Sequence, residues 1–304
     1  MTAKRLPYPG LPDAYDPRVH RAEVVAVRRV SDGMVRIALG GPDMRDYPTT
    51  GIGDEYVRLF FPDTPAEPVR LPFLTESGWD YPEGVAPSAM RTYTIRAHRE
   101  GAVDIDFATH EGGIAAAWAL QARPGQELGI NPPRPIYERP VWATRQLLIA
   151  DEPALPAALR IAELTAGQVD TTIIAEVRGP GHQMLADADG VDYVWLRGTG
   201  NGHGPSELLP ALRRTGLDER TYVWFGGEAR VNREVRRLLR HDRALPAGAQ
   251  TTLGYWTDRS EEWGARYEAL GEDFHERIRL LYESDRDTEE VVDEVFRLYE
   301  AAGL

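Results

Sequence analysis

The chain has 304 residues, long enough for two domains, and its 42% hydrophobic and 27% charged residues are typical of a globular protein. Its formal net charge of −13 argues against nucleic acid as a partner, because binding a phosphate backbone needs a basic surface. The absence of cysteine excludes structural disulfides, thiolate catalysis and iron–sulfur clusters with cysteine ligands.

Other features of the composition exclude further kinds of chemistry. Lys4 is the only lysine, so Schiff-base catalysis is not expected. The seven histidines show neither the His-x-x-His nor the His-x-x-x-His spacing of a metal site. No segment approaches the roughly 18 apolar residues of a membrane helix, and the first residues lack the apolar core of a secretory signal. We therefore expect a cytoplasmic protein with no protein-bound metal and no membrane contact.

The first half of the chain has the pattern of a small β-barrel. Residues 22–39 contain two apolar segments around an Asp-Gly pair, which predicts a strand, a tight turn and a strand. Further strands are expected at residues 55–61, 91–96, 102–108 and 126–130, with one helix at 115–122. The proline-rich residues 62–87 are expected to form a surface loop or functional flap. Many short strands with one helix favour an antiparallel Greek-key barrel.

Residues 91–96, R-T-Y-T-I-R, place two guanidiniums, a phenol and two hydroxyls on one short strand. Alternation along a strand turns Arg91 and Tyr93 to one face, and Thr92, Thr94 and Arg96 to the other. Arg91 could hold a diphosphate with two hydrogen bonds while Tyr93 lies against a planar ring. The alternative is a solvated strand with one aromatic side chain in the core.

A second segment, residues 110–118, has the sequence H-E-G-G-I-A-A-A-W. Its glycine pair allows phosphate to approach the backbone closely, and the free N–H groups at a helix start suit an anion. The alternative is a plain turn before a helix. Together the two segments predict a site for a phosphate-bearing ring cofactor.

From about residue 140, apolar strands alternate with amphipathic helices. Residues 145–150 are a continuous apolar segment that leads into Asp151-Glu152-Pro153 and a helix with Leu155 and Leu159 inward. Further strands are expected at 170–177, 193–196 and 221–225, with helices at 208–212 and after Glu228. This alternation predicts a doubly wound parallel sheet, in which ligands bind at the carboxyl ends of the strands.

Residues 198–204, G-T-G-N-G-H-G, are similar to a nucleotide-binding loop, but His203 stands where G-x-G-x-x-G has its last glycine. We interpret the segment as a flexible loop that leads into a helix.

Residues 260–304 predict two amphipathic helices. Apolar residues recur at steps of three and four between Trp263 and Leu281, and again from Val291 to Leu298. We expect both helices to pack on the body of the protein, and a dimer or partner surface is the alternative.

In their order along the chain, residues 91–96 and 110–118 resemble the motifs of the FAD-binding siderophore-interacting proteins, which are ferric-siderophore reductases related to ferredoxin–NADP reductase. Further segments agree with that family: residues 131–134 (N-P-P-R), 151–157 (D-E-P-A-L-P-A), 224–228 (W-F-G-G-E) and 254–256 (G-Y-W). The resemblance covers residues 22–256. It implies an FAD-binding barrel domain at residues 1–139, an NAD(P)H-binding-like α/β domain at 140–258 and a C-terminal helical extension at 259–304.

The resemblance implies bound FAD, with Arg91 on the diphosphate. Tyr93 at the flavin ring and Thr94 at the flavin N5 edge would be the catalytic residues. Residues 113–116 would contact phosphate through backbone N–H groups, and Ala116 stands where the family often has a hydroxyl or glycine. The implied set of cofactor-binding residues, for FAD and the dinucleotide together, is Arg91, Thr92, Tyr93, Thr94, Arg96, His110, Gly113, Ile114, Ala115, Ala116, Trp118, Asp151, Glu152, Gly227, Glu228, Tyr255 and Trp256.

The implied activity is reduction of a ferric siderophore, with NADH or NADPH passing a hydride to the flavin and single electrons passing on to Fe(III). Iron is then substrate rather than a resident metal. Many ferric siderophores are anionic, and the basic positions that match the family's substrate site are Arg58, Arg134 and Arg259. Each of these could equally be a solvated surface arginine.

The electron donor is left open by the sequence. Asp151 and Glu152 would repel a diphosphate, and Pro153 replaces a usual hydroxyl. The helix after Glu228 carries Arg230, Arg233 and Arg237, which could take a 2′-phosphate or simply be solvated. The sequence does not separate NADH, NADPH and reduced ferredoxin, nor a monomer from a dimer.

Two other functions stay open. One is a general flavin oxidoreductase with a different acceptor. The other is a siderophore-binding module without redox activity, which the departures at Ala116 and Pro153 would favour. Retention of flavin separates the binding module from both enzymes, and acceptor preference separates the two enzymes.

Overall fold

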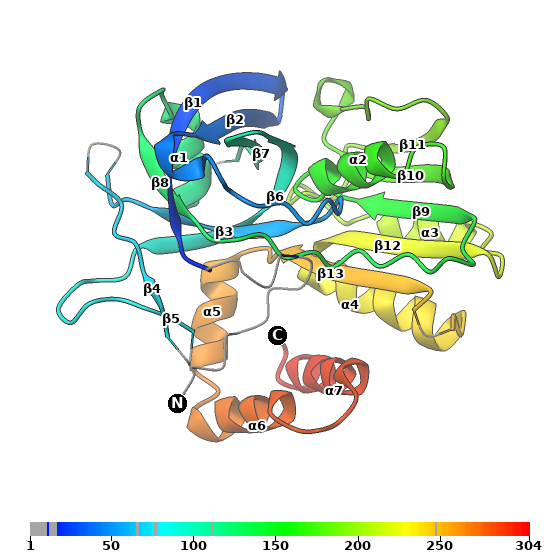
Figure 1. Ribbon diagram of the computed structural model, residues 1–304. Coiled ribbons are helices and arrows are strands. Elements are labelled where there is room, and N and C mark those ends of the chain that lie inside the picture. Colours follow the sequence, from blue (N-terminus) through cyan, green and yellow to red (C-terminus); the bar gives the residue numbers. More distant parts are fainter. Residues whose placement is uncertain (1–10, 12–16, 65–66, 76–77, 111, 247) are drawn as a thin grey trace.

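The computed structural model describes residue 11 and residues 17–64, 67–75, 78–110, 112–246 and 248–304. A β-barrel and a parallel sheet flanked by helices lie side by side, and three C-terminal helices lie against them (Figure 1). This is the predicted fold class. Glu111 of the segment 110–118 and most of residues 1–16 lie outside the described ranges.

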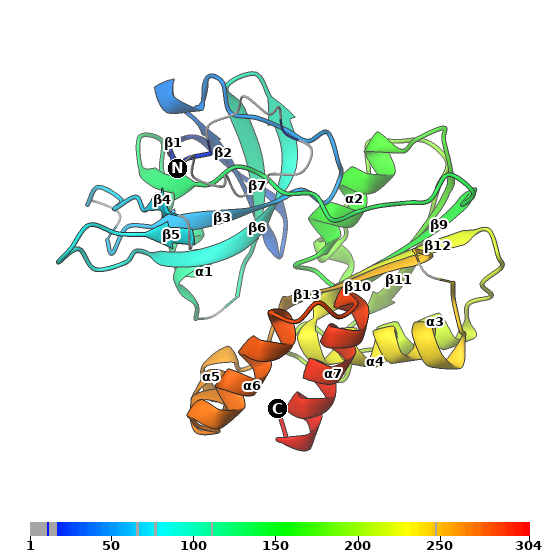
Figure 2. The ribbon, with the colours of Figure 1, turned by 60° about the horizontal axis from the view of Figure 1, so that its bottom comes forward.

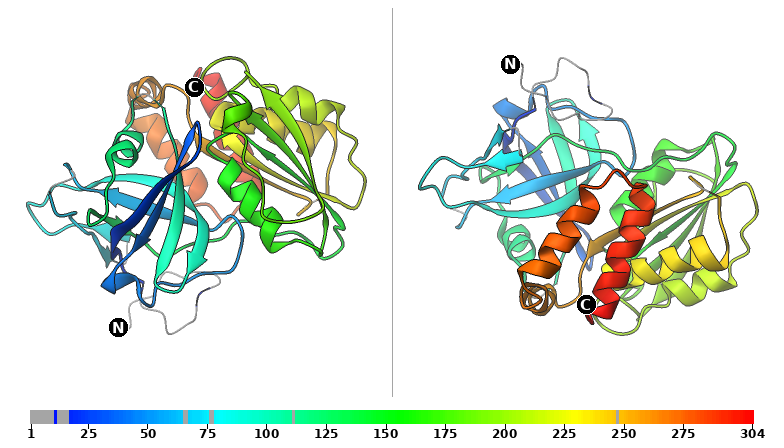
Figure 3. Two further views of the ribbon diagram at one scale, coloured as in Figure 1. Left: turned by 90° about the horizontal axis from the view of Figure 1, so that it is seen from above. Right: turned by 90° about the horizontal axis from the view of Figure 1, so that it is seen from below.

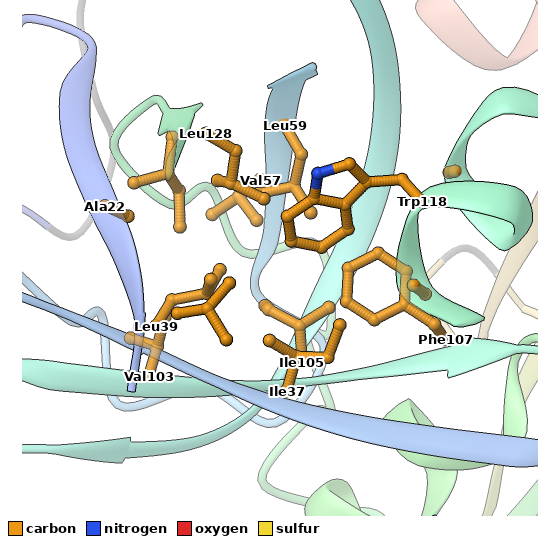
Figure 4. Packing of buried hydrophobic residues seen from close by; sticks show 14 of the residues in the cluster. Ala22, Ile37, Leu39, Val57, Leu59, Val103, Ile105, Phe107, Trp118 and Leu128 are labelled. Atoms are coloured by element: carbon orange, nitrogen blue, oxygen red, sulfur yellow. The ribbon is translucent and has the colours of Figure 1, made fainter. Parts of the chain in front are cut away.

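Six antiparallel strands close into the barrel, in the order β1-β2-β7-β6-β3-β8. Their bounds are β1 His20–Ser31, β2 Met34–Gly40, β3 Tyr56–Phe61, β6 Ala89–Arg99, β7 Ala102–Ala108 and β8 Glu127–Ile130. Alternate residues of these strands fill the interior with aliphatic side chains, as strand periodicity requires (Figure 4). Helix α1, Ile114–Gln121, adds Trp118, which packs against Phe107 with ring centroids 5.9 Å apart.

The proline-rich segment between β3 and β6 is not wholly irregular. It contains a short antiparallel pair, β4 Phe73–Thr75 and β5 Gly78–Asp80. Trp79 packs with Phe60 and Val69 in a small cluster beside the barrel, so burial of these side chains gives the segment structure that its prolines do not predict. A 3₁₀ turn, Pro42–Met44, follows β2.

The parallel sheet has the strand order β11-β10-β9-β12-β13. The bounds are β9 Arg145–Ala150, β10 Asp170–Val177, β11 Val191–Arg197, β12 Thr221–Glu228 and β13 Gln250–Trp256. Of the five strands of this sheet, only β13 was not expected. Chain order reverses between β9 and β12, and in doubly wound folds ligands bind beside the carboxyl ends of the strands at such a point. That point lies next to Asp151, Gly227 and Glu228.

Helices cover both faces of the sheet. They are α2 Leu155–Leu164, α3 Leu208–Arg214 and α4 Ala229–Arg237, which continues as a π-helical turn, Leu238–Asp242; a 3₁₀ turn, Pro180–His182, follows β10. One apolar core forms between α2 and the sheet, and a second forms between α3, α4 and the opposite face. The continuous apolar strands follow from this burial on two faces.

Buried ion pairs join the barrel to the sheet domain. Arg160 of α2 contacts Glu55 at 2.5 Å and donates to the Ile95 carbonyl at 2.5 Å. Arg96 of β6 contacts Glu163 of α2 at 2.7 and 2.5 Å. Because both pairs are largely shielded from water, they fix how β6 faces the sheet.

The C-terminal segment forms three helices, not the two that the apolar spacing predicted. They are α5 Ser260–Glu268, α6 Glu272–Tyr282 and α7 Thr288–Ala301. Gly271, with φ of 80°, lies between α5 and α6 and ends the helix although the apolar spacing continues, because a residue with positive φ cannot continue a right-handed helix. The apolar side chains of α6 and α7 pack on each other around Ile278, Val291 and Val295. Figures 2 and 3 show α7 running beside α4.

In the described part of the chain, no helix combines the length and apolar character needed to cross a lipid bilayer.

Candidate functional site

Strand β6 presents its two central residues to different surroundings. Tyr93 packs on Phe107 of the barrel core, with ring centroids 4.5 Å apart. Thr94 faces the sheet domain, where its Oγ1 lies 3.3 Å from the Tyr255 hydroxyl. Burial raises the pKa of Tyr93 and of Tyr255 well above that of an ordinary tyrosine, so both phenols stay neutral and keep their protons for hydrogen bonds.

Arg91 precedes these residues at an exposed position of β6. One of its guanidinium nitrogens donates to the Met90 carbonyl at 2.8 Å, and no ion pair of Arg91 is found among the described residues. Its other donors therefore face solvent, which suits an anionic ligand. Thr92 beside it is also exposed and pairs with Arg58 across the strands.

The start of α1 provides a second anion-binding feature. Gly112 and Gly113 have φ of 79° and 82°, and no side chain caps the helix. A side chain at Gly113 would lie 3.0 Å from the His110 ring, so the turn requires glycine in shape and in backbone conformation. The uncapped N–H groups at this start, with Arg91 and Tyr93, fit the diphosphate and ring of FAD.

A cavity of about 480 Å³ lies beside this turn and is lined by His110, Gly112, Arg29 and Arg178, among others. Sequence reasoning missed Arg29 and Arg178, which are 149 positions apart and carry no local motif. Arg178 comes from the sheet domain and donates to the Thr109 carbonyl at 2.9 Å. The cavity therefore draws on both domains.

The remaining residues of the segment 110–118 belong to α1, and most of them are buried beneath the glycine turn. Ala115, Ala116 and Trp118 are buried, with Ala115 and Trp118 in the barrel core, whereas Ile114 is exposed. Ala116 has no hydroxyl, so only backbone contacts to phosphate are available from it. Arg96, which was grouped with the cofactor residues, is placed in the domain boundary on Glu163.

Asp151 directly follows strand β9, at the reversal point of the sheet. Its carboxylate accepts from the Trp256 indole N–H at 2.6 Å and from the Ala154 N–H at 3.2 Å. Burial is the main cause that raises the pKa of Asp151 to about 7, with these hydrogen bonds opposing it. Gly227 packs against this carboxylate, since a side chain there would lie 3.1 Å from it. The Trp256 ring, which follows Tyr255 in β13, is therefore hydrogen-bonded to a carboxyl group that can gain or lose a proton.

Glu152 and Glu228 bind protein groups. Glu152 accepts from the Arg178 backbone N–H at 2.6 Å and lies 3.0 Å from the His182 ring. Glu228 caps α4 by accepting from the N–H groups of Arg230 and Val231 at 2.7 and 3.1 Å.

The three candidate substrate arginines come from three segments of the chain: Arg58 from β3, Arg134 from an isolated bridge beside it, and Arg259 from the start of α5. Arg134 pairs with Tyr56 of β3, and Arg58 is two residues further along that strand, so both point to the same face. Thr94 pairs with Tyr56 on this face, so the two arginines share a surface with the predicted flavin residue. Arg259 precedes α5 with φ of 49° and contacts Glu262 at 3.5 Å.

A second cavity, of about 780 Å³, opens at the carboxyl edge of the sheet. Its lining includes Asp151 and Trp256 at one end and Arg230, Arg233 and Arg237 of α4 along one side. Gly200 to Gly204, interpreted from sequence as a loop leading into a helix, also line it. These residues follow the carboxyl end of β11, and that position in a parallel sheet is the signal that could have identified them as part of a ligand site.

Two family models match the chain. One, described as the siderophore-interacting FAD-binding domain, matches residues 23–136, and one described as siderophore-interacting protein matches residues 143–259. The NADPH-dependent ferric-chelate reductase of Escherichia coli (strain K12) is 31% identical over 247 residues, which are 79% of this chain and 94% of that protein. Ferric vibriobactin reductase of Vibrio cholerae is 31% identical over 265 residues, 83% of this chain and 93% of the relative.

Solved structures give the same result. A siderophore utilization protein from T. fusca has a TM-score of 0.71 at 31% identity, with 80% of this chain and 94% of that chain covered. The ferredoxin reductase of carbazole 1,9a-dioxygenase has a TM-score of 0.58 at 17% identity, which is a likeness of fold.

Proposed function

The chain belongs to the siderophore-interacting protein family, and we propose that it reduces ferric siderophores with electrons from NAD(P)H by way of bound FAD. The observation that carries this function is the approach of Thr94 to Tyr255, 3.3 Å apart across the domain boundary. The barrel strand with the flavin motif therefore faces the carboxyl edge of the sheet, where a dinucleotide binds in doubly wound folds.

On the barrel side, each residue has a role that its surroundings support. Arg91 and the N–H groups at the start of α1 would hold the diphosphate, because among the described residues no acidic side chain pairs with Arg91 and no side chain caps this helix start. Tyr93 would pack against the ring system, since its own ring is held in place by Phe107. Thr94 would orient the reactive edge through a hydrogen bond.

On the sheet side, Tyr255 and Trp256 would cover the site and exclude water. FAD, when bound, accepts a hydride from the dinucleotide and passes single electrons to Fe(III). Asp151 holds the Trp256 ring through its indole N–H, so this aromatic wall has a fixed orientation. With its pKa near 7, Asp151 can also hold or release a proton beside that wall.

Arg58, Arg134 and Arg259 would attract the anionic ferric siderophore. Arg58 and Arg134 share the barrel face that carries Thr94, so they would bind the ferric chelate close to the flavin edge that donates the electrons. Fe(III) is the substrate, and its release follows because siderophore oxygens bind Fe(II) much less tightly.

We keep a division into residues 1–139, 140–258 and 259–304 as a proposal. It is supported by the last barrel strand ending at Ile130 and the first sheet strand beginning at Arg145. A cytoplasmic location, a monomer or dimer, and reduced ferredoxin as a second donor are likewise proposals. Cell fractionation, sedimentation and rates with reduced ferredoxin would test them.

An absorption spectrum tests the function directly. The purified protein, supplied with FAD if needed, should be yellow, should lose its colour with anaerobic NADPH or NADH, and should regain it as Fe(II) appears after a ferric siderophore is added. A protein that binds no FAD would contradict the proposal and favour a binding module. Reoxidation only by other acceptors would favour a general flavin oxidoreductase.

A further inference from the structure

We propose that Arg230, Arg233 and Arg237 of α4 bind the phosphate groups of the dinucleotide donor, with Arg237 at the 2′-phosphate of NADPH. This inference rests on the proposed function and names the part of the protein that selects the donor.

The three arginines form a row on one face of α4. Spacing of three and four residues places them on one side of a helix, over a length of about 10 Å. All three line the cavity of about 780 Å³ at the carboxyl edge of the sheet. A row of guanidiniums along a cavity wall is suited to several phosphates of one ligand.

The other arginines of the same segment have a different role. Arg236 contacts Asp293 of α7 at 2.7 Å and is almost fully buried, and Arg240 contacts the same carboxylate at 3.4 Å. Arg230 and Arg237 are exposed, and in the described part of the chain their acidic partners, Glu234 and Glu300, lie 3.7 Å away. The helix thus uses one arginine pair to hold α7 and leaves the row loosely paired toward the cavity.

Acceptors already occupy backbone N–H groups at the starts of α2, α3 and α4, at this edge of the sheet. Glu228 accepts from the first N–H groups of α4, and Asp151 accepts from the Ala154 N–H just before α2. Glu176, which lines the cavity near the end of β10, accepts from the Glu207 N–H before α3 at 2.6 Å. Since these carboxylates also repel phosphate, the phosphates must rely on side chains further out.

The charge distribution then orients the ligand. Glu176 and Glu228 line the end of the cavity that also holds Asp151, and their charges exclude phosphate there but not the uncharged nicotinamide ring of the reduced donor. Trp256 lies at the same end, next to the Tyr255 that approaches Thr94. The arginine row begins beside this end and runs outward to Arg237, so the adenosine end of the dinucleotide lies there.

Acceptors from the C-terminal segment contact the row. The main-chain oxygen of Leu304 accepts from Arg233 at 3.1 Å, and Glu300 of α7 lies 3.7 Å from Arg237. A 2′-phosphate carries more charge and more acceptor atoms than either group, so it would displace them.

The experiment measures binding of adenosine 2′,5′-bisphosphate, by calorimetry, to the FAD-loaded full-length protein. We expect R233A/R237A to weaken binding about tenfold to a hundredfold, as loss of charged hydrogen bonds predicts. Adenosine 5′-monophosphate should respond much less to R237A alone. E300Q should strengthen binding of the bisphosphate, because it removes a competing carboxylate.

The control variant is R213A, which removes an exposed arginine of α3 outside the cavity. The R233K/R237K variant keeps the charge and should keep part of the affinity. Unchanged affinity in R233A/R237A would overturn the proposal. Equally weakened binding of the bisphosphate in E300Q and R237A would also overturn the proposal. It would mean that the Arg237–Glu300 pair serves only to hold α7.

Failure of this inference can be told apart from failure of the proposed function. Dithionite-reduced protein needs no dinucleotide, so R233A/R237A and the wild type should then reduce a ferric siderophore at equal rates. If the wild type reduces none, the reductase function fails while the nucleotide titration still tests the arginine row.

Discussion

At the scale of single residues, Asp151 is a buried carboxyl group. Its hydrogen bonds from Trp256 and Ala154 offset only part of the cost of burying its negative charge. Its pKa of about 7 is above the ordinary value of 3.8, so the folded protein binds a proton here more tightly than the unfolded chain does. The contribution of Asp151 to the free energy of unfolding is therefore greatest at low pH and is lost as pH rises toward 7.

We predict that D151N removes this pH dependence. Between pH 5 and 8, the free energy of unfolding of the wild type should fall relative to that of D151N by roughly 2 to 3 kcal/mol, at up to about 1.4 kcal/mol per pH unit. Urea titrations at several pH values measure the difference. D192N changes an exposed carboxylate of β11 and is the control. Parallel pH profiles for the wild type and D151N would contradict the prediction.

The three candidate substrate arginines make a prediction about affinity. In R58A/R134A/R259A, KM for an anionic ferric siderophore should rise about tenfold, since each exposed charge contributes roughly 0.5 kcal/mol or more. The wild-type KM should also rise with salt, and that of the variant should rise less. R213A/R214A/R220A removes the same charge from α3 and the turn after it. An unchanged KM in the first variant would exclude these arginines from substrate binding.

At the scale of elements, local periodicity predicted most of the fold. The barrel strands and the alternating strands and helices were found because their apolar patterns are set by burial on one or two faces. Strand β13 was missed because its sequence, Q-T-T-L-G-Y-W, has a polar start and a glycine. The helices α5 and α6 were merged because their apolar spacing continues across Gly271.

The candidate site was predictable only where it is local in sequence. The segments 91–96 and 110–118 carry their chemistry in consecutive residues, so strand alternation and helix-start geometry, together with the family resemblance, were enough to propose them, and their roles stay predictions. Arg178, by contrast, reaches Thr109 only through folding of the two domains. The capping of helix starts by Asp151 and Glu176 depends in the same way on the arrangement of the sheet.

Attachment of α7 is the element-scale feature that can be tested most simply. Asp293 is shared by Arg236 and Arg240, and it joins α7 to α4. D293N should loosen α7 by about 1 to 3 kcal/mol, because it weakens contacts to two partly buried guanidiniums. Hydrogen–deuterium exchange should then quicken in α6 and α7 and stay unchanged in β9 and β12. E276Q, which alters an exposed pair within α6, should change neither pattern. Equal quickening throughout the sheet would argue against local attachment.

At the scale of the whole molecule, one buried cluster fixes the two domains relative to each other. Glu55 is fully buried and accepts from the Thr49 hydroxyl, from the Thr50 N–H and hydroxyl, and from Arg160 of α2. Arg160 also donates to the Ile95 carbonyl, one residue after Thr94. The same contacts that join the domains therefore set the distance between β6 and β13, on which the site depends.

We predict that R160M destabilises the protein by about 3 to 5 kcal/mol, because Glu55 stays buried without its cation. The double variant E55Q/R160M should recover part of this loss, since no unpaired charge then remains. R160M should also weaken FAD binding, because Thr94 and Tyr255 are no longer held at one distance. Calorimetric unfolding and FAD titration measure the two effects, and R145A, which alters an exposed pair with Asp218, should affect neither. If R160M unfolds like the wild type, or if the double variant is less stable than R160M, the cluster does not join the domains in the way proposed.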